Sequence, residues 1–195
     1  MKLPTPLSAA LLGLATFVTV QAASPWSVRL APAYLQTVDS TSNNVNVATE
    51  DKFIPEFDVN YAFNSHWSVE LMLTVPQEHN VKVNGTPAGD FKELPPSLFA
   101  KYSFTPVGGF TPYIGAGVNY TIIFDTELGG AKLDTYSVGP AVLVGCDYKI
   151  NARWSLTAEV KKIQLRTDVT TALGAKVTEA RLDPWLYSLG VCYQF

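Results

Sequence analysis

LDPWLYSLGVCYQF, residues 182–195, is the stretch of sequence that decides the fold. From Trp185 to Phe195 every second residue is aromatic or aliphatic, and the residues between them are mostly small and never charged. A strand beside a soluble core usually carries charges on its outer face. Small residues instead suit the crowded inside of a narrow barrel, and a bulky apolar row suits lipid. The stretch therefore predicts the closing strand of an outer-membrane β-barrel.

Seven earlier segments of about ten residues repeat this alternation, which is the signature of membrane-spanning β-strands. They cover residues 26–38, 53–63, 67–75, 94–104, 111–124 and 133–148, and a seventh begins at Trp154. The connections after the second, fourth and sixth segments are short, whereas the others, including residues 39–52 and 76–93, are longer and more polar. We expect an all-β fold, an eight-stranded antiparallel up-and-down transmembrane β-barrel, with periplasmic turns and extracellular loops.

A soluble barrel of the lipocalin type is the main structural alternative, because it also has eight strands and a secreted origin. It would point the aromatic rows inward, where eight strands enclose too little room for them. It would also place a set of glycines on the solvent face for no physical reason: Gly115, Gly117, Gly139, Gly145 and Gly190. The pattern therefore favours the membrane barrel.

The N-terminus has the features of an export signal. Lys2 gives a positive start, residues 7–20 are almost all apolar, and Val20-Gln21-Ala22 offers small residues where a signal peptidase cleaves. The apolar run is too short for a spanning helix. We predict a signal peptide over residues 1–22 and a barrel over residues 23–195, exported to the outer membrane of a Gram-negative cell.

Charge and cysteine content exclude some functions. The formal net charge is −3 and no basic block occurs, so nucleic acid is not an expected partner. Cys146 and Cys192 fall on opposite faces of their strands, which argues against a disulfide between them. We expect no cofactor and no metal site.

Five motifs follow one another in the mature chain: residues 75–79 (VPQEH), 92–96 (KELPP), 112–121 (PYIGAGVNYT), 183–185 (DPW) and 193–195 (YQF). In this order they resemble the OmpW family of eight-stranded outer-membrane proteins, which includes AlkL-type importers of hydrophobic compounds. The family usually has phenylalanine after the first proline, where this chain has Gln77. The resemblance implies a lateral opening in the barrel wall near Pro95 or Pro96. The terminal Phe195 resembles the signal that the outer-membrane assembly machinery recognises.

The inward rows divide into two environments. Charged residues of both signs occupy the lower and middle barrel, where we expect paired side chains to act as a plug. They are Arg29, Asp58, Glu70, Lys101, Asp147, Glu159 and Lys161. A proton or ion path through them is the alternative interpretation.

Toward the loops the inward rows become apolar, although an interior facing water has no structural need for that. These residues predict a funnel for a small hydrophobic molecule that enters from outside. They are Leu35, Ile54, Met72, Phe99, Ile123, Leu133, Ile163, Leu165, Leu182 and Leu186.

A hydrophobic ligand would need an exit that avoids the charged plug. Pro95 and Pro96 remove two consecutive backbone donors, so our hypothesis is that they weaken strand pairing and create a lateral opening to the bilayer. The alternative is that Pro95 merely starts a strand. Pro140 is expected to interrupt the sixth strand in the same way.

Two other functions stay open in the sequence. The loops could serve a receptor or adhesion role with the barrel as an anchor. A lipid A-modifying enzyme would need serine, histidine and acid on one patch, and only Ser97 near His79 offers a start, so we expect no enzyme. The expected partners are outer-membrane lipids and lipopolysaccharide, a small hydrophobic ligand and the assembly machinery, with the protein itself a monomer.

Overall fold

The structure is a computed structural model, and it describes residues 24–37, 40–42, 45–48, 51–83, 86–127, 132–170 and 176–195. The predicted signal peptide, residues 1–22, lies outside the described residues and stays a prediction. None of the described residues belongs to a helix with the length and hydrophobicity of a membrane span.

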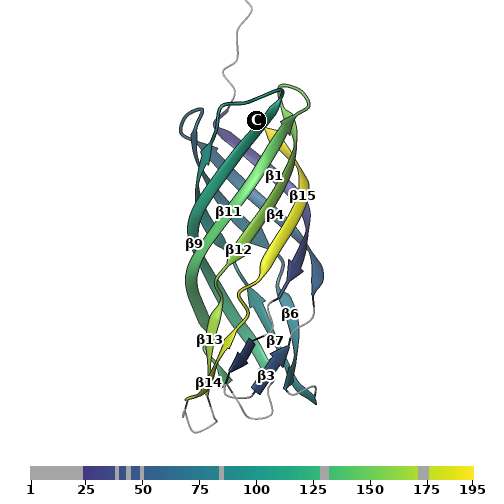
Figure 1. The fold of residues 1–195 in the computed structure, drawn as a ribbon, viewed down its shortest axis with the longest axis vertical. Helices are drawn as coiled ribbons and strands as arrows, with labels where there is room; N and C mark the ends of the chain where they lie inside the picture. Colours follow the sequence, from purple (N-terminus) through teal and green to yellow (C-terminus); the bar gives the residue numbers. More distant parts are fainter. Residues whose placement is uncertain are drawn as a thin grey trace, which may run out of the picture.

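Eight antiparallel strands close the barrel in the order of the chain, and the first pairs with the last (Figure 1). They are β1 (Trp26–Gln36), β4 (Lys52–Ala62), β5 (Trp67–Thr74), β8 (Ser97–Ser103), β9 (Phe110–Glu127), β11 (Tyr136–Lys149), β12 (Trp154–Ile163) and β15 (Trp185–Gln194). Inward and outward residues alternate along β15, where Leu186 and Ser188 are buried and Tyr187 and Leu189 are exposed. The predicted barrel and its closing strand are confirmed.

Asparagine side chains build two of the short turns. In the turn after β4, Asn64 Oδ1 accepts hydrogen bonds from the amides of His66 and Trp67, each at 2.9 Å. In the turn after β11, Asn151 Oδ1 accepts in the same way from the amides of Arg153 and Trp154. We call this end of the barrel, with residues 63–66, 104–109, 150–153 and the C-terminus, the turn end; it is uppermost in Figure 1.

The opposite end, which we call the hairpin end, carries the remaining strands. They are β2 (Ser40–Ser42), β3 (Val45–Ala48), β6 (Gln77–Val83), β7 (Thr86–Leu94), β10 (Lys132–Leu133), β13 (Arg166–Thr170) and β14 (Lys176–Arg181). The sequence predicted loops over residues 39–52 and 76–93, and this was wrong for much of both segments. These strands are rich in polar residues and too short for a sustained apolar alternation that would reveal them, and backbone pairing holds them as hairpins.

Two further boundaries differ from the prediction. The fourth spanning strand, expected from residue 94, is divided: β7 ends at Leu94 and β8 begins at Ser97. Pro140 does not interrupt β11, because it keeps its place opposite Val118 and its carbonyl accepts from the Gln164 amide at 3.0 Å. Strand β11 therefore continues through Pro140 although proline has no N–H to donate.

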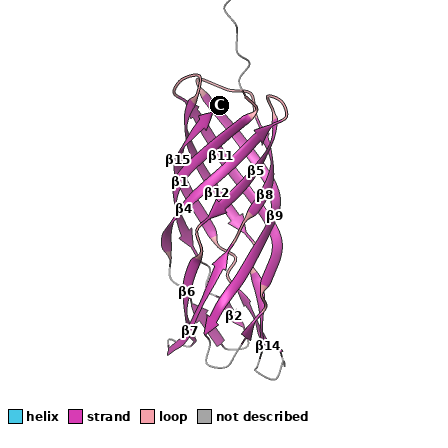
Figure 2. Cartoon of the chain, turned by 180° about the vertical axis from the view of Figure 1, so that it is seen from behind, coloured by secondary structure: helices cyan, strands magenta, loops and turns pink. Residues whose placement is uncertain are grey.

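Exposed aromatic side chains form two belts on the outer surface, one toward each end of the barrel. Figure 2 shows the strands of the barrel from the side opposite to that in Figure 1. At the turn end they pair across neighbouring strands: Trp26 with Tyr61, Phe110 with Tyr148 and Trp154 with Tyr193, each with centroids 4.8 Å apart. Toward the hairpin end the pairs are Tyr34 with Phe53 and Tyr120 with Tyr136. Between the belts lie exposed aliphatic residues: Leu30, Leu98, Val118, Val142 and Leu189. An apolar band flanked by aromatic belts is the surface of an outer-membrane barrel.

Candidate functional site

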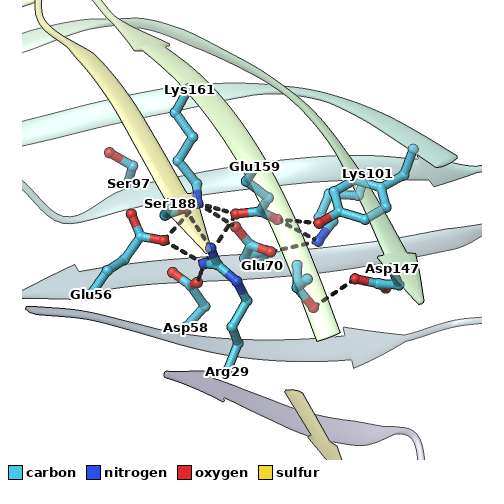
Figure 3. Close-up of polar contacts among 12 residues, drawn as sticks. Arg29, Glu56, Asp58, Glu70, Ser97, Lys101, Asp147, Glu159, Lys161 and Ser188 are labelled. Carbon is cyan, nitrogen blue, oxygen red and sulfur yellow. Dashed lines mark hydrogen bonds and ion pairs between the residues drawn. The ribbon is translucent and has the colours of Figure 1, made fainter. Parts of the chain in front are cut away.

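Charged side chains from five strands converge inside the barrel (Figure 3). Both signs are present, and all but one of these side chains are at most 1% exposed. We call this cluster the charged plug and define it by Arg29, Glu56, Asp58, Glu70, Lys101, Glu159 and Lys161.

Arg29 connects four strands of the barrel wall. Its guanidinium on β1 forms ion pairs with Glu56 and Asp58 on β4 and lies 3.1 Å from Glu159 on β12. A second terminal nitrogen donates to Ser188 Oγ on β15. A planar guanidinium offers five N–H donors, so one buried arginine can satisfy several acceptors at once.

The two lysines complete the network. Lys161 Nζ lies 3.0 Å from Glu56 and 3.7 Å from Glu70, and it also bonds Glu159. Lys101 Nζ lies 2.6 Å from Glu70 and 3.3 Å from Glu159. Each glutamate of the charged plug therefore contacts at least two cations, which offsets the cost of burying its charge.

Oxygens of Glu56, Asp58 and Glu159 lie within 4.8 Å of one another, a spacing that could suit a metal ion. Arg29 pairs with all three carboxylates, and Lys161 pairs with Glu56 and Glu159. The protein's own cations thus compensate these charges, so the arrangement is a salt-bridge network.

The structure brings together six of the seven residues proposed as a plug. Asp147 forms no ion pair with them among the described residues, and its Oδ1 accepts a hydrogen bond from Thr157 Oγ1 at 2.8 Å. Sequence reasoning omitted Glu56, although period two places it on the same inward row as Asp58. It also missed Tyr113, whose hydroxyl donates to Glu159 at 2.7 Å and whose ring lies 4.0 Å from Lys101 Nζ.

A polar cavity of about 460 Å³ lies between the charged plug and the turn end. Arg29, Lys101 and Tyr113 line it on the side of the charged plug, and Asn64 and His66 line it at the turn. Water-sized space thus reaches the charged plug from one end of the barrel.

Apolar side chains occupy the interior on the other side of the charged plug. Of the predicted funnel residues, six are at most 2% exposed and belong to one hydrophobic cluster: Leu35, Ile54, Met72, Phe99, Ile163 and Leu186. Ile123, Leu165 and Leu182 are buried as well. Leu133 lies in β10, but its side chain is outside the described part of the chain.

Polar side chains interrupt this apolar interior, which the sequence interpretation did not anticipate. Asn119 Nδ2 donates to Ser97 Oγ at 3.0 Å and Thr121 Oγ1 donates to Asn119 Oδ1 at 2.6 Å. Ser97 thus has Asn119 as its partner, whereas His79 lies 3.1 Å from Glu93. The pairing of Ser97 with His79 considered for an enzyme is not formed.

Pro95 and Pro96 lie in the barrel wall between β7 and β8. Pro95 is buried in the inward row and Pro96 is half-buried. Toward β9 the ladder continues past them, because the Tyr120 amide donates to the Pro96 carbonyl at 2.9 Å and Leu94 pairs with Ile122.

The ladder on the other side of the two prolines is interrupted. Within the described residues, pairing of β8 with β5 stops at Met72–Ser97, and pairing of β7 with β6 begins at Gln77–Glu93. Between these pairs, residues 73–76 lie opposite residues 94–96, so the first segment is one residue longer than the second. Prolines in the second segment have no N–H to donate, which accounts for the missing pairs.

Comparison with known proteins gives one consistent family. The OmpW family profile matches residues 22–195. An outer-membrane protein of Sinorhizobium fredii, y4mB, is 37% identical over 184 residues, covering 88% of this chain and 80% of the relative. The dibenzothiophene metabolism operon protein PahQ of Pseudomonas aeruginosa is 31% identical over 199 residues, covering 88% and 89%.

A solved structure agrees with this result. The crystal structure of the outer-membrane protein OprG from Pseudomonas aeruginosa superposes with a TM-score of 0.74 at 29% sequence identity. The match covers 89% of this chain and 97% of OprG.

Proposed function

Because this chain belongs to the OmpW family of outer-membrane proteins, we propose that it is a passive channel for small hydrophobic molecules. In this proposal the molecule enters the apolar interior from the hairpin end, which faces the outside of the cell. It then leaves sideways into the bilayer through the wall near Pro95 and Pro96. The protein itself stands in the outer membrane.

The observation that carries the proposal is the contrast between the two halves of the lumen. Apolar residues such as Leu35, Met72 and Phe99 lie on one side of the charged plug, and a polar cavity lies on the other. Entering the apolar interior lowers the free energy of a hydrophobic molecule, because its surface leaves water. To reach the polar cavity it would have to displace the paired charges of the charged plug. The apolar side chains are packed together, so entry requires them to move apart.

The interrupted ladder supports a lateral exit. Residues 73–76 and 94–96 lack described pairing with each other, so separating the wall there breaks fewer backbone hydrogen bonds than elsewhere. This position is on the apolar side of the charged plug, since Met72 and Ser97 form the last pair of β5 with β8.

The name of one relative supports a hydrophobic cargo. PahQ is described as a dibenzothiophene metabolism operon protein, and dibenzothiophene is a hydrophobic aromatic compound. We propose the same broad class of cargo for this protein, with the charged plug acting as a structural closure of the lumen.

Uptake of a hydrophobic probe tests the proposal. Cells with an intact outer membrane that produce the protein should take up naphthalene several-fold faster than cells that do not. Replacing Pro95 and Pro96 together by alanine restores two backbone donors and should reduce this flux, whereas Pro112→Ala, at the turn end, should not. Unchanged flux in the double variant would exclude the lateral route, and no flux above background would exclude transport.

A further inference from the structure

An acid–base pair lies on the inward face of the hairpin formed by β6 and β7. His79 Nε2 is 3.1 Å from Glu93 Oε1, and both residues are 2% exposed. The imidazole stacks on the ring of Phe91, with centroids 5.3 Å apart. Neither member of the pair belongs to the charged plug or to the predicted funnel.

The pair lies beside the proposed exit route. Phe91, Glu93 and Pro95 are successive buried residues of one inward row, so Glu93 is the next inward position from Pro95 toward the hairpin end. Glu93 also sits opposite Ile123 of β9, one of the apolar interior residues. A molecule that leaves the lumen near Pro95 would therefore pass the pair.

Each member of the pair has one buried polar atom without a hydrogen-bond partner among the described residues. These atoms are Nδ1 of His79 and Oε2 of Glu93. A neutral imidazole bonds a carboxylate only by donating its Nε2–H, which leaves Nδ1 as an acceptor. Both unpartnered atoms are then acceptors, and the group that complements them is a hydrogen-bond donor.

A neighbouring cation bears on whether that donor should be charged. Lys52, at the hairpin end of β4, donates from Nζ to the backbone carbonyl of Glu78, next to His79. Because Lys52 already supplies a positive charge next to His79, a neutral hydroxyl fits the unpartnered acceptors better than an ammonium group.

We infer that the His79–Glu93 pair is a recognition site for the hydroxyl group of an amphipathic cargo, such as an alcohol or a phenol. The hydroxyl donates its one O–H to one of the two unpartnered acceptors, while the hydrocarbon part contacts Phe91 and the apolar interior. This inference rests on the proposed transport function and narrows its substrate class from plain hydrocarbons to hydroxylated ones.

Two matched probes test the site: naphthalene and 2-naphthol, which differ by one hydroxyl group. The variants are His79→Phe, which keeps an aromatic ring on Phe91 but removes both nitrogens, and Glu93→Gln, which removes the charge. Glu78→Gln, at an exposed outward position of the same hairpin, is the control. Circular dichroism and thermal unfolding of each purified variant confirm that the barrel is folded.

In cells producing the full chain, we expect each site variant to reduce 2-naphthol uptake about tenfold, the usual effect of losing a hydrogen bond to a charged group. Naphthalene uptake should change less than twofold, and the control should leave both probes unchanged. Equal loss for both probes, or no loss for 2-naphthol, would overturn the inference while leaving the transport proposal intact.

Equilibrium binding separates the site from transport. Purified wild-type protein in detergent should bind 2-naphthol more tightly than naphthalene, and His79→Phe should remove this preference. This result would support the site even if cells show no flux of either probe, in which case the transport proposal alone fails. Equal binding of both probes to the wild type would overturn the inference.

Discussion

Lys161 Nζ lies 3.0 Å from Glu56 Oε1, although the two residues are 105 positions apart in the chain. Their strands are not neighbours, since β15 and β1 lie between β12 and β4 in the wall. The ion pair therefore crosses the lumen. It shows that the charged plug connects parts of the wall that share no backbone hydrogen bonds.

Removing one cation from the charged plug should destabilise the barrel strongly. Lys161→Met leaves Glu56 and Glu159 buried with less compensation, and breaking such a pair typically costs about 3–5 kcal/mol. Urea unfolding in lipid vesicles would measure the change. Lys149→Met, at an exposed position on the turn end, is the control and should shift unfolding by less than about 0.5 kcal/mol. Similar stability of the two variants would mean that the charged plug is not structural.

Gly117 should not tolerate a side chain, because a Cβ atom there would lie 2.0 Å from the Leu98 carbonyl oxygen and 2.8 Å from the Phe99 Cα. Backbone atoms cannot yield as a flexible side chain can, so Gly117→Ala should push β8 from β9 and cost about 1–3 kcal/mol. The neighbouring Ala116 faces outward and is exposed. Ala116→Val is thus the matched control, and equal yields of folded barrel for both variants would contradict the prediction.

Phe195 should matter for assembly more than for stability. Its ring is 54% exposed and contacts Tyr193 with centroids 5.3 Å apart, and its amide donates to Trp26 at 3.2 Å. Phe195→Ala keeps that backbone bond and should change the unfolding free energy by less than about 1 kcal/mol. We expect several-fold less folded protein in the outer membrane of growing cells. A normal amount in cells would argue against recognition of this residue by the assembly machinery.

Much of the barrel follows from the sequence by itself. Side chains alternate between the two faces of any strand, so the residues of β15 reveal which row meets lipid without knowledge of its neighbours. The same local rule places Arg29, Glu70 and Lys161 inside. Turns such as Asn64-Ser65-His66 can be predicted from sequence for the same reason: the asparagine side chain accepts hydrogen bonds from amides that are only two or three residues further along the chain.

Only the tertiary structure decided which inward residues meet. The contact of Glu56 with Lys161 depends on the register of each strand against the next around the closed barrel. The sequence pattern of a single strand does not determine this register. The His79–Glu93 pair was hidden for another reason. Its hairpin mixes polar and apolar residues on the inward face, so alternation gives no clear signal, and backbone pairing of β6 with β7 brings the two side chains together.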